Sequence, residues 1–296
     1  MNPKTNVTLP LKFILVKKQI ILATAAILSV TLLFFFGRTA EPSKVASLPP
    51  VVVANAFDIN QFITQAKAKL SPAQAIYISK LENGISRGDV AAQQVKANFS
   101  LANFWKDSIK LFEPYAFYIS EASKLDNSEK NLTFAAQLFL DKLRQEHDDA
   151  KLNWETTEAI ELFEKAIQLN PDNDDLKIGL GSCYIYGKGK SGDPQQTMKG
   201  IQQLLAVVRK DSTNMKAQFV LGVGGAVSGQ YDKALERLRK VVAAQPTNLE
   251  AIAFLADTYA AKGEKQEAIK WYNVSKRLAN NKQYSQEVDE RIKLLE

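Results

Sequence analysis

The stretch ALERLRKVVAAQP, residues 234–246, carries a pattern that recurs along the C-terminal half of the chain. Its first, fifth and eighth positions share one face of an α-helix, because spacings of four and three residues return to the same side. Equivalent patterns start at Ala159, Gly200 and Ala268, so the steps are 41, 34 and 34 residues. A step near 34 residues predicts stacked helix pairs, each burying its apolar face on the next. The shared-face triplets are Ala159, Phe163, Ala166; Gly200, Leu204, Val207; Ala234, Leu238, Val241; and Ala268, Tyr272, Ser275.

Each expected pair also carries signals at fixed places outside these triplets. The second helices end at Asn170-Pro171, Asp211-Ser212 and Gln245-Pro246, and proline cannot continue a helical hydrogen-bond ladder. The first helices contain Leu180-Gly181 with Tyr184, Leu221-Gly222 with Gly225, and Leu255-Ala256 with Tyr259. Together these residues resemble the tetratricopeptide repeat (TPR) signature, which has a unit of about 34 residues. The resemblance implies an α-solenoid of TPR-like helix pairs, which we expect over residues 131–283.

The repeat is irregular upstream. The step of 41 residues exceeds 34 by seven, and we assign the excess to an extended loop at 187–194. Residues 131–159 fit the repeat only with an insertion around 144–154, and residues 57–130 form a helical region with one degenerate repeat, in which Ala116, Ser120 and Ser123 keep the spacing. The final segment, 284–296, is predicted to be an amphipathic capping helix. Nothing after residue 56 alternates with a strand period, so the predicted fold class is all-α.

The N-terminal part predicts a membrane anchor. Residues 20–37 are uncharged and mostly apolar, long enough at about 1.5 Å per residue to span most of a hydrocarbon core of about 30 Å. We therefore expect a cytoplasmic segment at 1–18, a transmembrane helix at 19–37 and a linker at 38–56. Four lysines precede the run, which favours a cytoplasmic N-terminus. Cleavage as a signal peptide after Ala40 would place Arg38 where a small residue is needed.

This organisation resembles the single-pass, membrane-anchored TPR proteins of the bacterial cell envelope. It implies an inner-membrane protein whose C-terminal domain lies in the periplasm. Charge agrees with the division of the chain. The formal net charge of +6 includes +5 in residues 1–50, from six basic residues and one acidic residue, so the remaining 246 residues carry only +1. No nucleic-acid partner is predicted, because the domain has no basic excess.

Residues suited to catalysis or metal binding are scarce. The chain has one histidine, His147, in a polar segment, and one cysteine, Cys183, within an expected repeat helix. A nucleophile needs an adjacent base, and structural zinc usually needs four Cys or His ligands. Residues 187–191, GKGKS, resemble the end of a phosphate-binding loop, but Tyr184 stands where that loop requires glycine. We expect no cofactor, no metal and no enzymatic activity.

The resemblance also implies a binding surface. In TPR proteins, positions two, five, nine, twelve and thirteen of the first helices face a concave groove that holds peptides. TPR modules that clamp a carboxylate place Lys and Asn there, whereas Ile178, Ser182, Phe219 and Val223 predict an apolar middle. The alternative is that these residues are buried by the N-terminal helices or by a second copy of the chain. The groove positions are Asp175, Ile178, Ser182, Ile185, Tyr186; Lys216, Phe219, Val223, Ala226, Val227; and Glu250, Ala253, Asp257, Ala260, Ala261.

These observations predict an anchored scaffold that binds a protein or peptide partner or assembles a complex outside the cytoplasm. Two other functions stay open. A periplasmic holdase chaperone would use an exposed apolar groove to bind unfolded chains. An enzyme would need carboxylate chemistry, for example from buried acidic residues in a closed pocket. The sequence leaves the partner and a homo-oligomeric state undecided.

Overall fold

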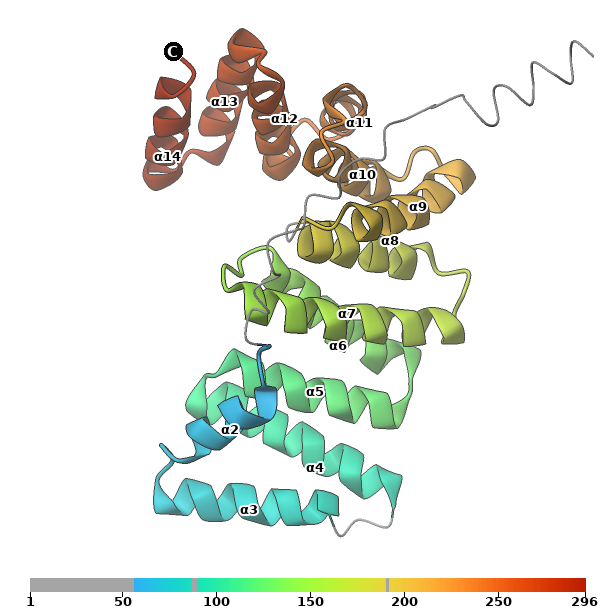
Figure 1. Ribbon diagram of the computed structural model, residues 1–296, viewed down its shortest axis with the longest axis vertical. Coiled ribbons are helices and arrows are strands. Elements are labelled where there is room, and N and C mark those ends of the chain that lie inside the picture. Colours follow the sequence, from blue (N-terminus) through green and yellow to red (C-terminus); the bar gives the residue numbers. More distant parts are fainter. Residues whose placement is uncertain (1–55, 87–89, 190–191) are drawn as a thin grey trace, which may run out of the picture. The chain divides into compact units, whose positions relative to one another are not determined.

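The structure is a computed structural model that describes residues 56–86, 90–189 and 192–296 (Figure 1). These residues fall in one compact unit, Ala54–Glu296. The predicted transmembrane helix at 19–37 and nearly all of the linker at 38–56 lie outside the described residues. Within the described residues, no helix is both long and apolar enough to cross a bilayer. The described elements are all helices, so the all-α prediction is confirmed for this part of the chain.

Successive helices pack in pairs along the chain (Figure 1). Two π-helical turns, η1 and η2, extend the helices that precede them. First helices also contact one another from unit to unit, α6 with α8, α8 with α10 and α10 with α12. The bounds are α2 Ile59–Lys67, α3 Pro72–Ser86, α4 Ala91–Asn103, η1 Phe104–Ile109, α5 Phe112–Asp126, α6 Glu129–Leu143, α7 Asp149–Leu169, α8 Asp174–Cys183, η2 Tyr184–Gly189, α9 Pro194–Lys210, α10 Met215–Val227, α11 Tyr231–Ala244, α12 Leu249–Lys262, α13 Lys265–Ala279 and α14 Lys282–Lys293.

Polar side chains fix where several helices begin. Asp58 accepts hydrogen bonds from the backbone N–H groups of Asn60 and Gln61 at the start of α2. Ser71 and Gln74 form a reciprocal capping box before α3, with contacts of 3.0 and 3.4 Å. These caps satisfy N–H groups that have no partner within the helix. They also set the angle at which the chain enters the stack.

All twelve residues of the four triplets are buried, so the predicted repeat face is confirmed. Small residues let the helices of a pair approach closely. A Cβ atom added to Gly181 would lie 2.7 Å from Leu204, and one added to Gly222 would lie 2.8 Å from Leu238. Both leucines are fully buried middle residues of their triplets. Glycine is therefore required for close packing between α8 and α9 and between α10 and α11.

Two predicted insertions have a different structure from the one expected. The insertion around 144–154 is a short connection at 144–148 followed by extra turns at the start of α7, which has 21 residues. The expected loop at 187–194 is helical up to Gly189, because η2 continues α8. Gly187 is buried directly against Thr156 of α7, where a larger residue would clash. Residues 190–191 lie outside the described residues.

The buried residues form two hydrophobic clusters. The first core runs from Ile59 to Tyr184 and includes Trp105, Phe139 and Phe163. The second core runs from Ile178 to Val288 and is rich in Ala, Val and Leu. Tyr186 packs against both clusters. The capping helix α14 begins at Lys282 and buries Val288, as the amphipathic pattern predicts.

Candidate functional site

The predicted groove positions divide into buried and exposed groups. Ile178, Ser182, Ile185, Phe219 and Val223 are all buried, none above 8% exposure. The apolar middle expected from the sequence is therefore not an open surface. Tyr186, Ala226, Ala253, Asp257 and Ala260 are half-buried, and the exposed positions are Asp175, Lys216, Val227, Glu250 and Ala261.

Contacts between neighbouring first helices account for this burial. Ile178, Ile185 and Phe219 all belong to the second core. The Ile185 side chain lies against Gly224 of α10, and Phe219 meets Phe254 of α12 edge to face with ring centroids 5.6 Å apart. The alternative that these positions are buried is thus correct. They are covered largely by the adjacent first helices rather than by the N-terminal helices.

A side-chain bridge spans the groove above these residues. Arg144, just after α6, donates from Nη1 to Glu250 Oε1 of α12 at 2.9 Å. Its guanidinium lies over the Tyr186 ring, 4.8 Å from the centroid. Burial raises the pKa of the Tyr186 phenol, so the ring stays neutral beneath the arginine. Residues from α6, η2 and α12 therefore close the middle of the groove.

The C-terminal end of the groove remains hollow. A pocket of about 140 Å³ lies among α12, α13 and α14, and we call it the terminal pocket. Its apolar wall is made by Phe254, Tyr272, Tyr284 and Val288. Its charged groups are Glu250, Asp257, Glu287 and Arg291. Two predicted groove residues, Glu250 and Asp257, therefore line a pocket together with the capping helix.

Asp257 is the centre of the polar contacts in the terminal pocket. Its Oδ1 accepts hydrogen bonds from the Tyr272 hydroxyl at 2.5 Å and from Arg291 Nη1 at 2.8 Å. The Asp257 carboxylate raises the pKa of Arg291. Burial, followed by the bond to Asp257, raises the pKa of Tyr272. Tyr272 therefore stays neutral and Arg291 charged, and both orient Asp257.

The α14 side of this pocket was missed in the sequence, although the repeat step contains the signal. Adding 34 to the groove positions 250, 253 and 257 gives Tyr284, Glu287 and Arg291. All three line the terminal pocket. Helix α14 thus occupies the place of a further first helix. Reading it only as a solvent-facing cap overlooked its groove face.

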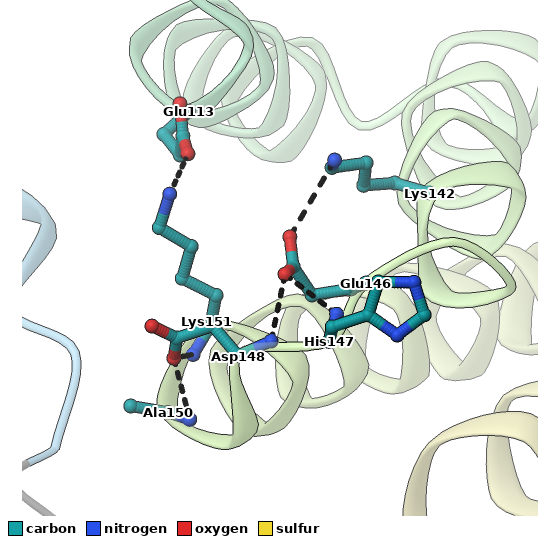
Figure 2. Close-up of polar contacts among 7 residues, drawn as sticks. All are labelled: Glu113, Lys142, Glu146, His147, Asp148, Ala150 and Lys151. Atoms are coloured by element: carbon teal, nitrogen blue, oxygen red, sulfur yellow. Dashed lines mark hydrogen bonds and ion pairs between the residues drawn. The ribbon is translucent and has the colours of Figure 1, made fainter.

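A buried acidic cluster lies elsewhere, where α5, α6 and α7 meet (Figure 2). Glu113 pairs with Lys151, and both side chains are largely shielded from solvent. Glu146 accepts from the backbone N–H groups of His147 and Asp148 at 2.8 and 2.9 Å and pairs with Lys142 at 3.5 Å. Burial alone would raise the pKa of Glu146, but these contacts outweigh it and lower the pKa. The described contacts are a helix start and two ion pairs.

Glu155 of α7 extends this cluster. Its side chain is fully buried, and neither carboxylate oxygen has a hydrogen-bond partner within the described part of the chain. Burial raises its pKa to about 8, and the nearby charge of Glu146 adds to the shift. Glu155 is therefore protonated at neutral pH. His147 is exposed and Cys183 fully buried, as predicted.

Comparison with known proteins agrees with the repeat assignment. The model of a tetratricopeptide repeat family matches residues 155–217 and 228–286. These two segments are tetratricopeptide repeats, so the resemblance predicted from the sequence is confirmed. Over 170 residues the chain is 27% identical to the BBSome complex member BBS4 of Bos taurus. That match covers 57% of this chain but only 28% of BBS4.

Solved structures share the fold. TTC0263, a thermophilic TPR protein of Thermus thermophilus, has a TM-score of 0.50 and 16% identity, covering 68% of this chain and 98% of that chain. MamA from Desulfovibrio magneticus has a TM-score of 0.46 and 16% identity, covering 64% and 96%. The chain therefore has the fold of a TPR interaction scaffold. At these identities the likeness concerns the fold alone.

Proposed function

We propose that this chain is a membrane-anchored scaffold that binds a protein partner through the first-helix face of its TPR solenoid, outside the cytoplasm. The observation that carries the proposal is the terminal pocket, where Glu250 and Asp257 of α12 meet Arg291 of α14. Rigid stacked helices hold these groups in place before binding, which reduces the cost of ordering them. No catalytic step is assigned.

The anchor is supported by the sequence alone. The uncharged run at 20–37 follows four lysines, as expected of a single helix whose N-terminus stays in the cytoplasm. Anchoring would raise the effective concentration of the scaffold for partners in the same membrane. Protease added to spheroplasts should digest residues 57–296 while a cytoplasmic control protein survives. Full protection of the domain would contradict the proposed orientation.

Partner binding is tested by site-specific photocrosslinking in the native membrane. A benzophenone amino acid replaces half-buried Ala253 in the terminal pocket, and a second variant carries it at exposed Glu236 of α11. We expect a crosslinked protein partner from position 253 and none from position 236. Equal capture at both positions, or no partner and no self-contact at either, would contradict the scaffold.

A holdase chaperone is the second candidate, but the buried groove middle supports the specific scaffold instead. Ile178, Phe219 and Val223 are not available to an unfolded chain. An aggregation assay with a thermally unfolding client separates the two. Substoichiometric suppression of aggregation by the full-length protein in detergent would favour the holdase.

A further inference from the structure

We infer that the terminal pocket binds one basic side chain, a lysine or an arginine, of the protein partner. The inference rests on the proposed function, because it names the chemistry of the partner at the C-terminal end of the groove. Three features support it: carboxylate oxygens that accept no described hydrogen bond, an aromatic wall, and a volume suited to one side chain.

The first feature is an unused acceptor on each of three carboxylates. Described hydrogen bonds to Asp257 reach only Oδ1. Those to Glu250 and Glu287 reach only Oε1, from Arg144 and Gln283 respectively. Within the described residues, Asp257 Oδ2, Glu250 Oε2 and Glu287 Oε2 therefore remain for a ligand. An ammonium group has three donors and a guanidinium five, and neither has an acceptor.

The second feature is the wall that a basic side chain would contact. Phe254, Tyr272 and Tyr284 contribute aromatic surface to the same pocket as the carboxylates. The methylene stem of lysine or arginine packs well on such surface while its charged end reaches the carboxylates. Arg291 already reaches Asp257 within this pocket, so the site accommodates a guanidinium from the chain itself.

Size and charge narrow the choice of ligand. The volume of about 140 Å³ suits a single side chain rather than a helix. Three carboxylates against one guanidinium give the lining a formal charge of −2. An apolar side chain would strip water from these carboxylates without replacing its hydrogen bonds, and an acidic one would be repelled. Among the described residues, no His, Cys, Asp and Glu side chains are grouped so as to hold a metal ion, which favours an organic cation.

The test uses the full-length protein in detergent and four fluorescein-labelled heptapeptide libraries. The central residue is Lys, Arg, norleucine or Glu, and each flanking position is an equimolar mixture of uncharged amino acids. Fluorescence polarisation should show half-saturation for the Lys or Arg library at about fivefold lower protein concentration than for norleucine. The Glu library should bind most weakly.

Two variants assign this preference to the pocket. Glu287 is exposed and its only described hydrogen bond comes from Gln283, so Glu287→Gln should preserve the fold while it removes a charge from the pocket. Glu236→Gln makes the same charge change on the exposed face of α11. We expect Glu287→Gln to reduce the preference to about twofold or less, and Glu236→Gln to leave it intact. Circular dichroism checks that both variants stay folded.

Several outcomes would overturn the inference. Equal binding of the Lys, Arg and norleucine libraries would contradict it, as would identical behaviour of the two variants. If Ala253 still crosslinks a partner in either case, the proposed function survives and only the basic-residue assignment fails. A crosslinked segment that lacks Lys or Arg within four residues of the attachment point would have the same meaning. Loss of both peptide binding and crosslinking would refute both proposals.

Discussion

The two hydrophobic cores of the solenoid achieve burial in different ways. The first core relies on large side chains, among them Trp105, Phe139 and Phe163, and it also contains the unpartnered Glu155. The second core relies on small residues at a fixed step, such as Ala234 and Ala268, with leucines between them. Large side chains fill gaps of varying width, so the first core accommodates irregular helix lengths. Close contacts at small residues require a constant spacing instead.

The largest expected effect comes from removing a large side chain from the first core. Trp105→Ala should lower the free energy of unfolding by about 3–5 kcal/mol, because it leaves a cavity at a fully buried site. Urea unfolding followed by far-UV circular dichroism measures the change. Ile76→Ala, at a side chain that is 71% exposed, serves as the control and should change stability by under about 0.5 kcal/mol. Similar values for the two variants would contradict the assigned core.

Glu155 gives the first core a pH dependence. Its pKa in the folded state is about 8, above its ordinary value of 4.5, so the folded protein binds more protons than the unfolded chain between these values. Stability should therefore fall as the pH rises from 4.5 to 8. Glu155→Met should raise the free energy of unfolding by roughly 3 kcal/mol at pH 7 and by under roughly 1 kcal/mol at pH 5.

The control for this prediction is Glu236→Met at an exposed site on α11. It should change stability little, and equally at both pH values. Urea unfolding of each variant at pH 5 and pH 7 gives the four differences needed. A Glu155→Met effect that does not change with pH would show that the carboxyl does not titrate in this window.

The same substitution at two glycines should have opposite signs in the two halves. Gly222→Ala places a Cβ atom 2.8 Å from the fully buried Leu238, which should cost about 1–3 kcal/mol. Gly84→Ala in α3 places a Cβ atom 3.7 Å from Ala97, an ordinary contact. It should stabilise by about 0.5–1 kcal/mol through helix propensity. Thermal unfolding compares the two, and destabilisation by both would contradict the distinction.

The smallest expected effect belongs to the bridge that connects the two halves. The Arg144–Glu250 pair is partly exposed, with side chains 39% and 46% accessible, so water screens much of its attraction. A double-mutant cycle with Arg144→Ala and Glu250→Ala should give a coupling energy below about 1 kcal/mol. A coupling of several kcal/mol would show that the bridge holds the halves together rather than only covering Tyr186.

Much of the regular half could be predicted from sequence. The triplets, the helix-ending Asn-Pro and Gln-Pro pairs and the 34-residue step all describe contacts repeated between neighbours. The irregular half could not be predicted in the same detail. The helical turns that replace the expected insertion before Trp154 depend on packing against α6, and a sequence period does not record that packing.

The candidate site was predictable only in part. Periodicity placed Ile178 and Phe219 on the groove face correctly, but it could not show that adjacent first helices approach closely enough to bury them. Glu250 and Asp257 were found because they occupy repeat positions. Arg144 contacts Glu250 across 106 residues of sequence, a distance that no local pattern reveals. Arg291 was within reach of the repeat rule once α14 is treated as a first helix.

The shared wall of the terminal pocket links partner binding to order at the end of the chain. Helix α14 packs mainly on α13, and helix termini open more readily than the interior of a stack. A ligand held by both Asp257 and Glu287 binds only when α14 is in place. By mass action, its presence protects α14 from opening, by about 2.7 kcal/mol at a hundredfold excess over the dissociation constant. The amide protons of α14 would then exchange more slowly in the complex, so the last helix would report occupancy of the groove.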